Sequence, residues 1–200
     1  MLEKFLLTGL AAGALLGQSL SEGVGQYKSG RLAAAERTLR AAAEGPAEDQ
    51  PAANYYLALA QIEQEKLADA ESTVNRLAEE CPDSELSRIA RARLSIQRKQ
   101  FSEAETLLSE AEEINPGSSQ IAYVRGVLDV ARKEYRSGAR HLERALEREP
   151  DLAYAHYYAG LAYNGLKQLD KVVEHFQAFL RLAPQAPEAK KVQTLLRALK

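Results

Sequence analysis

The sequence has one cysteine, Cys81, and no tryptophan. A single thiol cannot form a disulfide within the chain, and it cannot supply the paired cysteines of a CxxC metal site. The 26 lysines and arginines nearly balance the 28 aspartates and glutamates, so the formal net charge is only -2. Nucleic acid and acidic membrane surfaces attract chains with a strong basic excess, and we therefore expect neither as a partner.

The sequence also lacks the motifs of common enzymes. It has no glycine-rich phosphate loop, no recognisable pair of catalytic carboxylates and no nucleophile elbow. The three histidines, His141, His156 and His175, show no spacing typical of metal ligands, and we interpret them as packing or surface residues. We predict a protein that is not an enzyme, with no cofactor, no metal site and no small-molecule substrate.

Charge is absent from the twelve residues Phe5 to Leu16, and small residues follow at Gly17, Ser19 and Ser21. This order is typical of a secretory signal peptide, with cleavage after Ser19 or Ser21. The apolar run is too short to span a bilayer comfortably as a permanent helix. We expect residues 1–19 to direct export to the periplasm or the medium. Two alternatives stay open: a retained membrane anchor, or a folded first helix of a cytoplasmic protein.

Prolines set a period along the rest of the chain, since Pro82, Pro116, Pro150 and Pro184 are each 34 residues apart. Repetition at such a period indicates an array of similar units. Three more series keep the period: small residues at Ala58, Ala92, Gly126 and Gly160, small residues at Ala70, Ala104 and Gly138, and large apolar residues at Leu67, Phe101, Tyr135 and Leu169.

One unit, residues 119–150, illustrates the physical logic. Apolar residues recur at helical spacing up to Val130, the pattern breaks near Lys133, and a second helix follows from Tyr135. Pro150 ends that helix, because proline has no backbone N–H and disfavours helix in the residue before it. A two-helix hairpin cannot bury its apolar faces alone, and stacked copies can.

These residues resemble the tetratricopeptide repeat family over about residues 18–184. The resemblance rests on two units that fit the family pattern position by position, through Ala92, Phe101, Ala104, Leu108, Ala111 and Pro116, and through Gly126, Tyr135, Gly138, Leu142, Ala145 and Pro150. It implies an all-α fold, a right-handed α-solenoid of about five helix-turn-helix units. We place the array at residues 20–184, with units at about 18–47, 51–84, 85–118, 119–152 and 153–184, and a C-terminal capping helix at residues 185–200.

The resemblance also implies a binding surface, because the first helices of successive units line a concave inner face in this family. That face is apolar and rich in tyrosine, a residue favoured at interfaces. It suits an extended or helical segment of a protein partner. The predicted partner-binding residues are Tyr27, Tyr55, Leu59, Ile62, Ile89, Arg93, Ile96, Tyr123, Val127, Val130, Tyr154, Tyr157, Leu161 and Asn164.

Two functional hypotheses follow from the predicted fold. The first is an adaptor that holds a partner segment on the concave face. The second is a structural scaffold or self-assembling component of a larger envelope complex, which associates through its outer face. Any single tyrosine could instead pack between repeats. We do not expect the C-terminal tail of a chaperone as the ligand, because Arg93 is the only residue at the matching positions that could bind its carboxylates.

Overall fold

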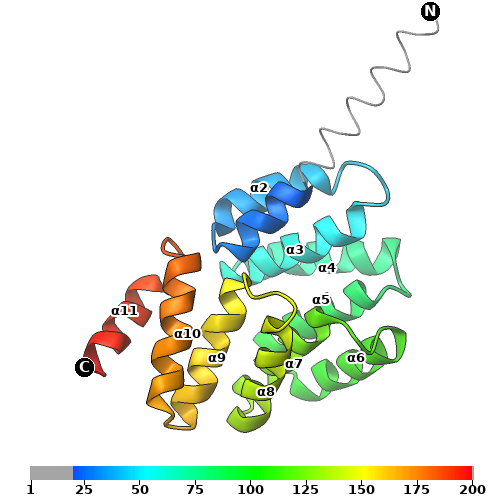
Figure 1. Cartoon of the computed structure of the whole chain (residues 1–200). Helices are drawn as coiled ribbons and strands as arrows, with labels where there is room; N and C mark the ends of the chain where they lie inside the picture. Colours follow the sequence, from blue (N-terminus) through cyan, green and yellow to red (C-terminus); the bar gives the residue numbers. More distant parts are fainter. Residues whose placement is uncertain (1–19, 200) are drawn as a thin grey trace, which may run out of the picture.

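The computed structural model describes residues 20–199, so the predicted signal segment lies outside the described residues. Residues 20–28 are helical, and the described part of the chain contains no strand. The fold is an all-α solenoid, as predicted (Figure 1). The further helices are α2 (Leu32–Ala42), α3 (Gln50–Glu63), α4 (Leu67–Glu80), α5 (Glu85–Gln97), α6 (Phe101–Ile114), α7 (Ser119–Ala131), α8 (Tyr135–Leu146), α9 (Ala153–Gly165), α10 (Leu169–Leu182) and α11 (Ala189–Ala198).

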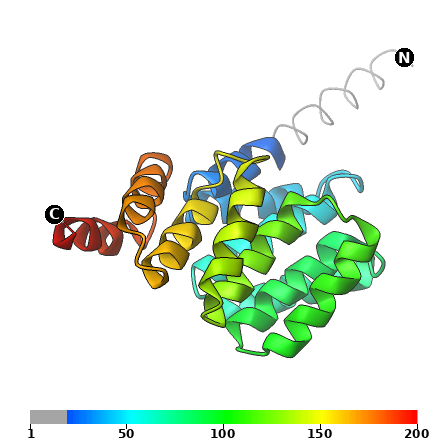
Figure 2. The same ribbon diagram turned by 60° about the horizontal axis from the view of Figure 1, so that its bottom comes forward.

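The helices form antiparallel pairs that stack side by side, as Figure 2 shows from a second direction. Residues 20–28 pack against α2, where a Cβ on Gly23 would lie 2.7 Å from the Leu39 side chain. The later pairs are α3 with α4, α5 with α6, α7 with α8, and α9 with α10. Helix α11 follows the last pair and buries only Ala189 and Val192. Large apolar side chains therefore stay exposed at this end of the stack, where Leu169 is 49% and Leu195 is 37% exposed.

One backbone turn joins the two helices of every pair. Its central residue has a left-handed backbone, with φ of 67° at Gly30, 60° at Glu65, 61° at Lys99, 64° at Lys133 and 59° at Lys167. The next residue donates its N–H to the carbonyl five residues earlier, as a helix-ending Schellman motif requires. Since only the first unit places glycine there, the turn is a property of the repeat and not of one residue type.

The small-residue series lets the paired helices approach closely. A Cβ atom on Gly126 of α7 would lie 2.4 Å from Cγ of Leu142 on α8. A Cβ on Gly160 of α9 would likewise lie 2.4 Å from the ring of Phe176 on α10. Both distances are too short for any side chain larger than hydrogen, so these positions define how the two helices of a unit meet.

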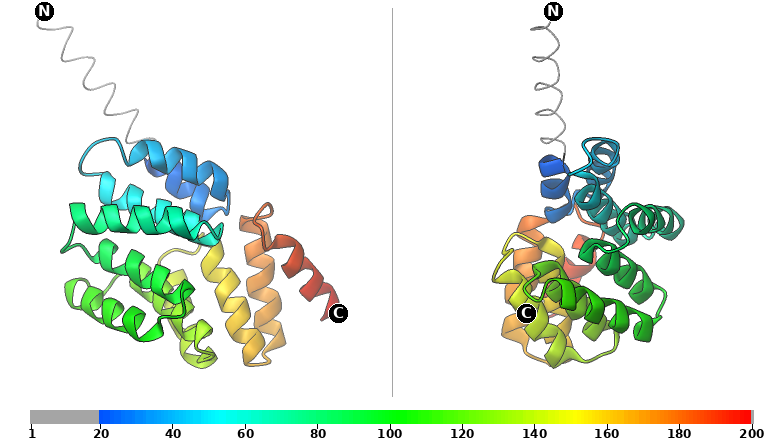
Figure 3. Two further views of the ribbon diagram at one scale, coloured as in Figure 1. Left: turned by 180° about the vertical axis from the view of Figure 1, so that it is seen from behind. Right: turned by 90° about the vertical axis from the view of Figure 1, so that its right-hand side faces the viewer.

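The array curves so strongly that its two ends meet. Figures 1 and 3 show the loop after α10 (orange) beside the first helices (blue). A Cβ on Gly30 would lie 2.5 Å from Cβ of Ala183 and 3.3 Å from Cβ of Ala186. We call the contact between residues 27–37 and residues 149–188 the seam. Within residues 20–199, no helix has the length and apolar character needed to cross a membrane.

Candidate functional site

The structure brings the predicted inner-face residues together, but it buries most of them. The prediction that these side chains line an open, exposed groove is therefore wrong. Their role in partner binding stays a prediction. Val130 and Leu161 are half-buried, and Asn164 is exposed. The buried members are Tyr27, Tyr55, Leu59, Ile62, Ile89, Arg93, Ile96, Tyr123, Val127, Tyr154 and Tyr157.

Curvature is the physical reason for this burial. In an open array each unit touches only its neighbours. Here the Tyr27 ring stacks on the Tyr154 ring, with centroids 6.2 Å apart and planes 18° apart. Lys28 Nζ lies 2.9 Å from Glu149 Oε2 and 3.3 Å from Asp151 Oδ1. First-unit side chains thus contact the end of the fourth unit and the start of the fifth, and the inner face becomes a core.

A polar cluster lies at the centre of this inner core. Arg93 and Glu63 form an ion pair with Nη2 2.8 Å from Oε1, and their side chains are 1% and 5% exposed. Arg93 also donates to Tyr158 Oη at 2.8 Å, and the hydroxyls of Tyr123 and Tyr158 each donate to Glu63 at 3.3 Å. The guanidinium carbon of Arg93 lies 5.7 Å from the centroid of the Tyr158 ring. One cluster thus connects four units.

The tyrosines around the cluster are held neutral by their surroundings. Burial raises the pKa of Tyr123 and Tyr154, since a phenolate would lose its hydration there. Burial also raises the pKa of Tyr157 to about 12. Tyr123 and Tyr154 therefore donate hydrogen bonds, to Glu63 and Glu188, and the Tyr157 ring packs among aromatic neighbours, so none of the three is an acid or base near neutral pH.

Part of the inner face stays accessible at the rim where α5, α7 and α9 approach one another. A depression of about 280 Å³ opens there. We call it the rim depression, and its lining residues are Arg93, Ile96, Gln97, Lys99, Phe101, Val127, Val130, Ala131 and Tyr158. Its walls are mainly apolar, and the exposed Lys99 lies at its edge. Only part of the predicted partner-binding site is therefore accessible at this depression.

Five residues of this lining are absent from the predicted partner-binding residues: Gln97, Lys99, Phe101, Ala131 and Tyr158. Tyr158 adjoins the predicted Tyr157, and consecutive helical residues point about 100° apart, so the inner-face register excluded it. It nevertheless reaches Arg93, because the inner face wraps around the cluster. Phe101 belongs to the series that starts each second helix, and its half-buried ring lines the rim depression.

The basic first helix of the third unit, α5, also bonds largely within the chain. Arg93 is buried, Arg98 lies 2.6 Å from Glu71, and Arg88 lies 3.4 Å from Glu110.

The histidines show one pairing that their spacing did not predict. Nδ1 of His156 lies 3.1 Å from Nδ1 of His175, and His156 Nε2 lies 3.1 Å from the Pro150 carbonyl oxygen. Burial lowers the pKa of both histidines. His141 Nδ1 lies 2.8 Å from Asp129 Oδ2 instead. Across residues 20–199, no three His, Cys, Asp or Glu side chains gather closely enough to hold a metal ion.

Comparison with known proteins identifies the family. A model described as tetratricopeptide repeat matches residues 20–85 and 123–187, which is more than half of the chain. The chain therefore belongs to the tetratricopeptide repeat family, as its sequence predicted. Proteins of this family are generally non-catalytic modules that mediate protein–protein interactions. A sequence search among curated proteins returned no significant match.

Solved structures with the same fold include TTC0263, a thermophilic TPR protein of Thermus thermophilus. It has a TM-score of 0.63 and 20% identity, and the match covers 92% of this chain and 98% of that one. The Cut9–Hcn1 hetero-tetramer of the APC/C also matches, with a TM-score of 0.63 and 15% identity over 92% of this chain and 36% of the other. At these identities the likeness shows the fold alone.

Proposed function

We propose that this protein is a non-catalytic adaptor that binds a protein partner at the rim depression. The observation that carries the proposal is that this depression is an accessible, hollowed part of the predicted inner face. It combines apolar walls, formed by Ile96, Val127 and Val130, with the exposed cation of Lys99. An apolar side chain of the partner fits the walls, and a neighbouring carboxylate of the partner complements the charge of Lys99.

The closed inner core limits how the partner binds. An extended segment cannot lie along the whole inner face, because the rings of Tyr27, Tyr123 and Tyr154 fill it. The depression of about 280 Å³ lies near the lower end of the range for ligand pockets, roughly 300–1,000 Å³. It therefore accommodates one large side chain of a partner better than a bulky small molecule.

A filling substitution tests this function. Ala131→Trp places an indole at the edge of the depression, and Ala68→Trp adds the same group to the exposed outer side of α4 as a matched control. Tagged full-length chains are purified from their own cells, and the bound proteins are identified by mass spectrometry. We expect the wild type and Ala68→Trp to retain a partner that Ala131→Trp loses. Retention of every partner by Ala131→Trp would contradict the proposal.

A scaffold role is the second candidate, and the C-terminal end of the array favours it. Leu169 and Leu195 remain exposed there, and exposed apolar side chains at a solenoid end favour stacking with another copy or another protein. Light scattering over a range of concentrations separates the two roles. A strict monomer at every concentration argues against self-assembly.

We also propose that the protein is exported, on the basis of the uncharged run from Phe5 to Leu16 and the small residues after it. Mass spectrometry of the N-terminus of the protein isolated from its source cell tests this. A mature chain that begins at residue 20 or 22 supports export with cleavage, and an intact N-terminus on a cytoplasmic protein contradicts it.

A further inference from the structure

A row of arginines follows the outer face of α8. Arg136, Arg140 and Arg144 are four residues apart, and all three are exposed. None of them takes part in an ion pair within residues 20–199. Arg140 makes only a long contact of 3.5 Å with Ser137 Oγ on its own helix. We call these three residues the α8 arginine row.

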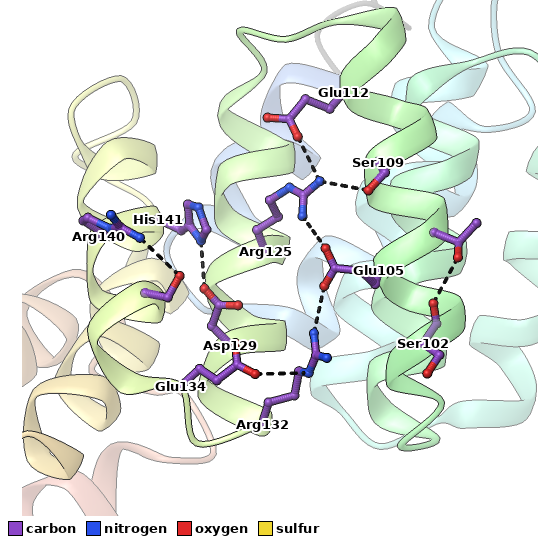
Figure 4. Close-up of polar contacts among 12 residues, drawn as sticks. Ser102, Glu105, Ser109, Glu112, Arg125, Asp129, Arg132, Glu134, Arg140 and His141 are labelled. Atoms are coloured by element: carbon purple, nitrogen blue, oxygen red, sulfur yellow. Dashed lines mark hydrogen bonds and ion pairs between the residues drawn. The ribbon is translucent and has the colours of Figure 1, made fainter.

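Nearby arginines on α7 and in the turn after it behave differently, as Figure 4 shows. Arg125 lies 2.8 Å from both Glu105 and Glu112 of α6. Arg132 lies 2.8 Å from Glu105 and 3.4 Å from Glu134. Those two arginines link neighbouring helices and stabilise the stack. The α8 arginine row makes no such link, so its charge does not serve the packing of the array.

The repeat register shows that the fold does not require arginine at these positions. The residues 34 positions earlier on α6 are Ser102, Thr106 and Glu110. The residues 34 positions later than Arg136 and Arg140, on α10, are Asp170 and Glu174. Other units thus form the same helix with neutral or acidic side chains. Substitutions at such exposed sites usually have little effect on stability, so the row can be changed without unfolding the array.

An apolar feature lies beside the row. A shallow depression of about 410 Å³ is lined by Glu134, Tyr135, Arg136, Ser137 and Arg140. The half-buried Tyr135 ring packs on Gly165 of α9, where a Cβ would lie 2.4 Å from ring carbon Cδ2. The face therefore offers a rigid aromatic surface next to two cations, a combination common at protein interfaces.

We propose that the outer face of α8 is a second interaction surface, which binds an acidic helical segment of a partner protein. Helical residues four apart are about 6 Å apart along the axis, so carboxylates at the same spacing face the three guanidinium groups in register. An apolar side chain of that segment packs beside Tyr135. This surface lies on α8, apart from the lining of the rim depression, and goes beyond the adaptor function proposed above.

The acids around the row favour a protein partner over a nucleic acid. Glu134, Glu143 and Glu147 are interspersed with the arginines in the sequence, and the whole chain carries a net charge of -2. A continuous phosphate backbone would meet these carboxylates and be repelled. A partner helix with separate carboxylates can instead place each carboxylate opposite an arginine and an uncharged residue opposite each glutamate of this surface.

A designed peptide tests the surface even while the natural partner is unidentified. The probe is a fluorescein-labelled helical peptide with glutamate at every fourth position and one leucine on the same face. Its binding to the full chain is measured by fluorescence anisotropy at two salt concentrations. We expect Arg136→Glu/Arg140→Glu/Arg144→Glu to weaken binding about tenfold or more, and added salt to weaken binding to the wild type.

The matched control reverses three exposed arginines elsewhere, Arg37→Glu/Arg91→Glu/Arg197→Glu, which changes the net charge by the same amount. We expect it to weaken binding less than about threefold, since screening limits distant charges. A peptide with lysine in place of glutamate should bind the α8 triple variant and not the wild type. Circular dichroism confirms that each variant is folded, and Arg136→Gln/Arg140→Gln/Arg144→Gln replaces the reversal if it is not.

Three results would overturn the inference. Equal weakening by the two triple variants would mean that only overall charge matters. Tighter binding of a single-stranded oligothymidylate than of the peptide, lost in the α8 variant, would assign the row to nucleic acid. Self-association of the wild type that the α8 variant abolishes would make a second copy the occupant. None of these results bears on the adaptor function, which the Ala131→Trp experiment tests separately.

Discussion

Closure of the array at the seam leads to a quantitative prediction for Gly30→Ala. Gly30 has a left-handed backbone with φ of 67°, and a Cβ there would lie 2.5 Å from Cβ of Ala183. A left-handed backbone costs an alanine roughly 1–2 kcal/mol. Overpacking by one methyl group costs roughly 1–3 kcal/mol more. We expect Gly30→Ala to lower the free energy of unfolding by about 2–5 kcal/mol.

Two variants at Lys133 are the control for this substitution. Lys133 has nearly the same backbone, with φ of 64°, but its side chain is exposed. The free energies of unfolding of Lys133→Gly and Lys133→Ala therefore differ by the backbone cost alone, roughly 1–2 kcal/mol in favour of glycine. The part of the Gly30→Ala loss in unfolding free energy that exceeds this Lys133 difference therefore measures the contact at the seam.

Urea unfolding followed by circular dichroism measures the loss. With a slope of about 2 kcal/mol per molar urea, the midpoint for Gly30→Ala falls by about 1–2.5 M. Acrylamide quenching gives a second measurement, because the chain has nine tyrosines and no tryptophan. An opened seam exposes Tyr27 and Tyr154 to the quencher. A Gly30→Ala loss within about 0.5 kcal/mol of the Lys133 difference, together with unchanged quenching, would show that the seam contact does not stabilise the fold.

Three further predictions concern the buried groups. Arg93→Met leaves Glu63 buried without its cation and lowers the free energy of unfolding by about 3–5 kcal/mol. In urea titrations the double variant Glu63→Met/Arg93→Met regains most of this loss, whereas additive losses from the two substitutions would refute the coupling. Gly160→Ala forces a methyl group against Phe176 and costs about 1–3 kcal/mol, while Gly25→Ala, at an exposed helical position with no atom within 4 Å, stabilises the protein by up to about 1 kcal/mol. A lower melting temperature for Gly25→Ala than for Gly160→Ala would contradict this packing. Burial raises the pKa of Tyr157 to about 12, so this phenol ionises at a lower pH in the unfolded chain than in the folded one. The stability that it contributes below pH 10 is therefore lost as the pH rises from about 10 to about 12. Urea midpoints that do not change over this range would be inconsistent with buried neutral phenols.

Local features of the structure were largely predictable from the sequence. Helices α4 and α6 end just before Pro82 and Pro116, because proline excludes helix from the residue before it. Gly126 meets Leu142 as the small-residue series requires. The repeated turn was located by the break in the apolar pattern, although the left-handed backbone at Lys133 could not be predicted from a residue type that rarely adopts it.

The candidate site was predictable only in part. The register correctly placed Arg93 and Tyr123 on the first helices, where they face the inside of the array. It could not tell whether that inside is open or filled, because small rotations between units add up over the array. The predicted groove and the observed core contain the same residues, and the curvature alone distinguishes them.

By itself, the sequence determined the family, the 34-residue unit and the all-α solenoid, since these depend on apolar spacing, small residues and prolines within one unit or its neighbour. Only the tertiary structure decided that the array closes. Tyr27 stacks on Tyr154 from the opposite end of the array, and Glu63 meets Arg93 and Tyr158, so that three different units share one contact. Such contacts depend on the summed geometry of all the units, so no local pattern encodes them. That closure moves the accessible surface from the inner face to the rim depression and to the outer face of α8.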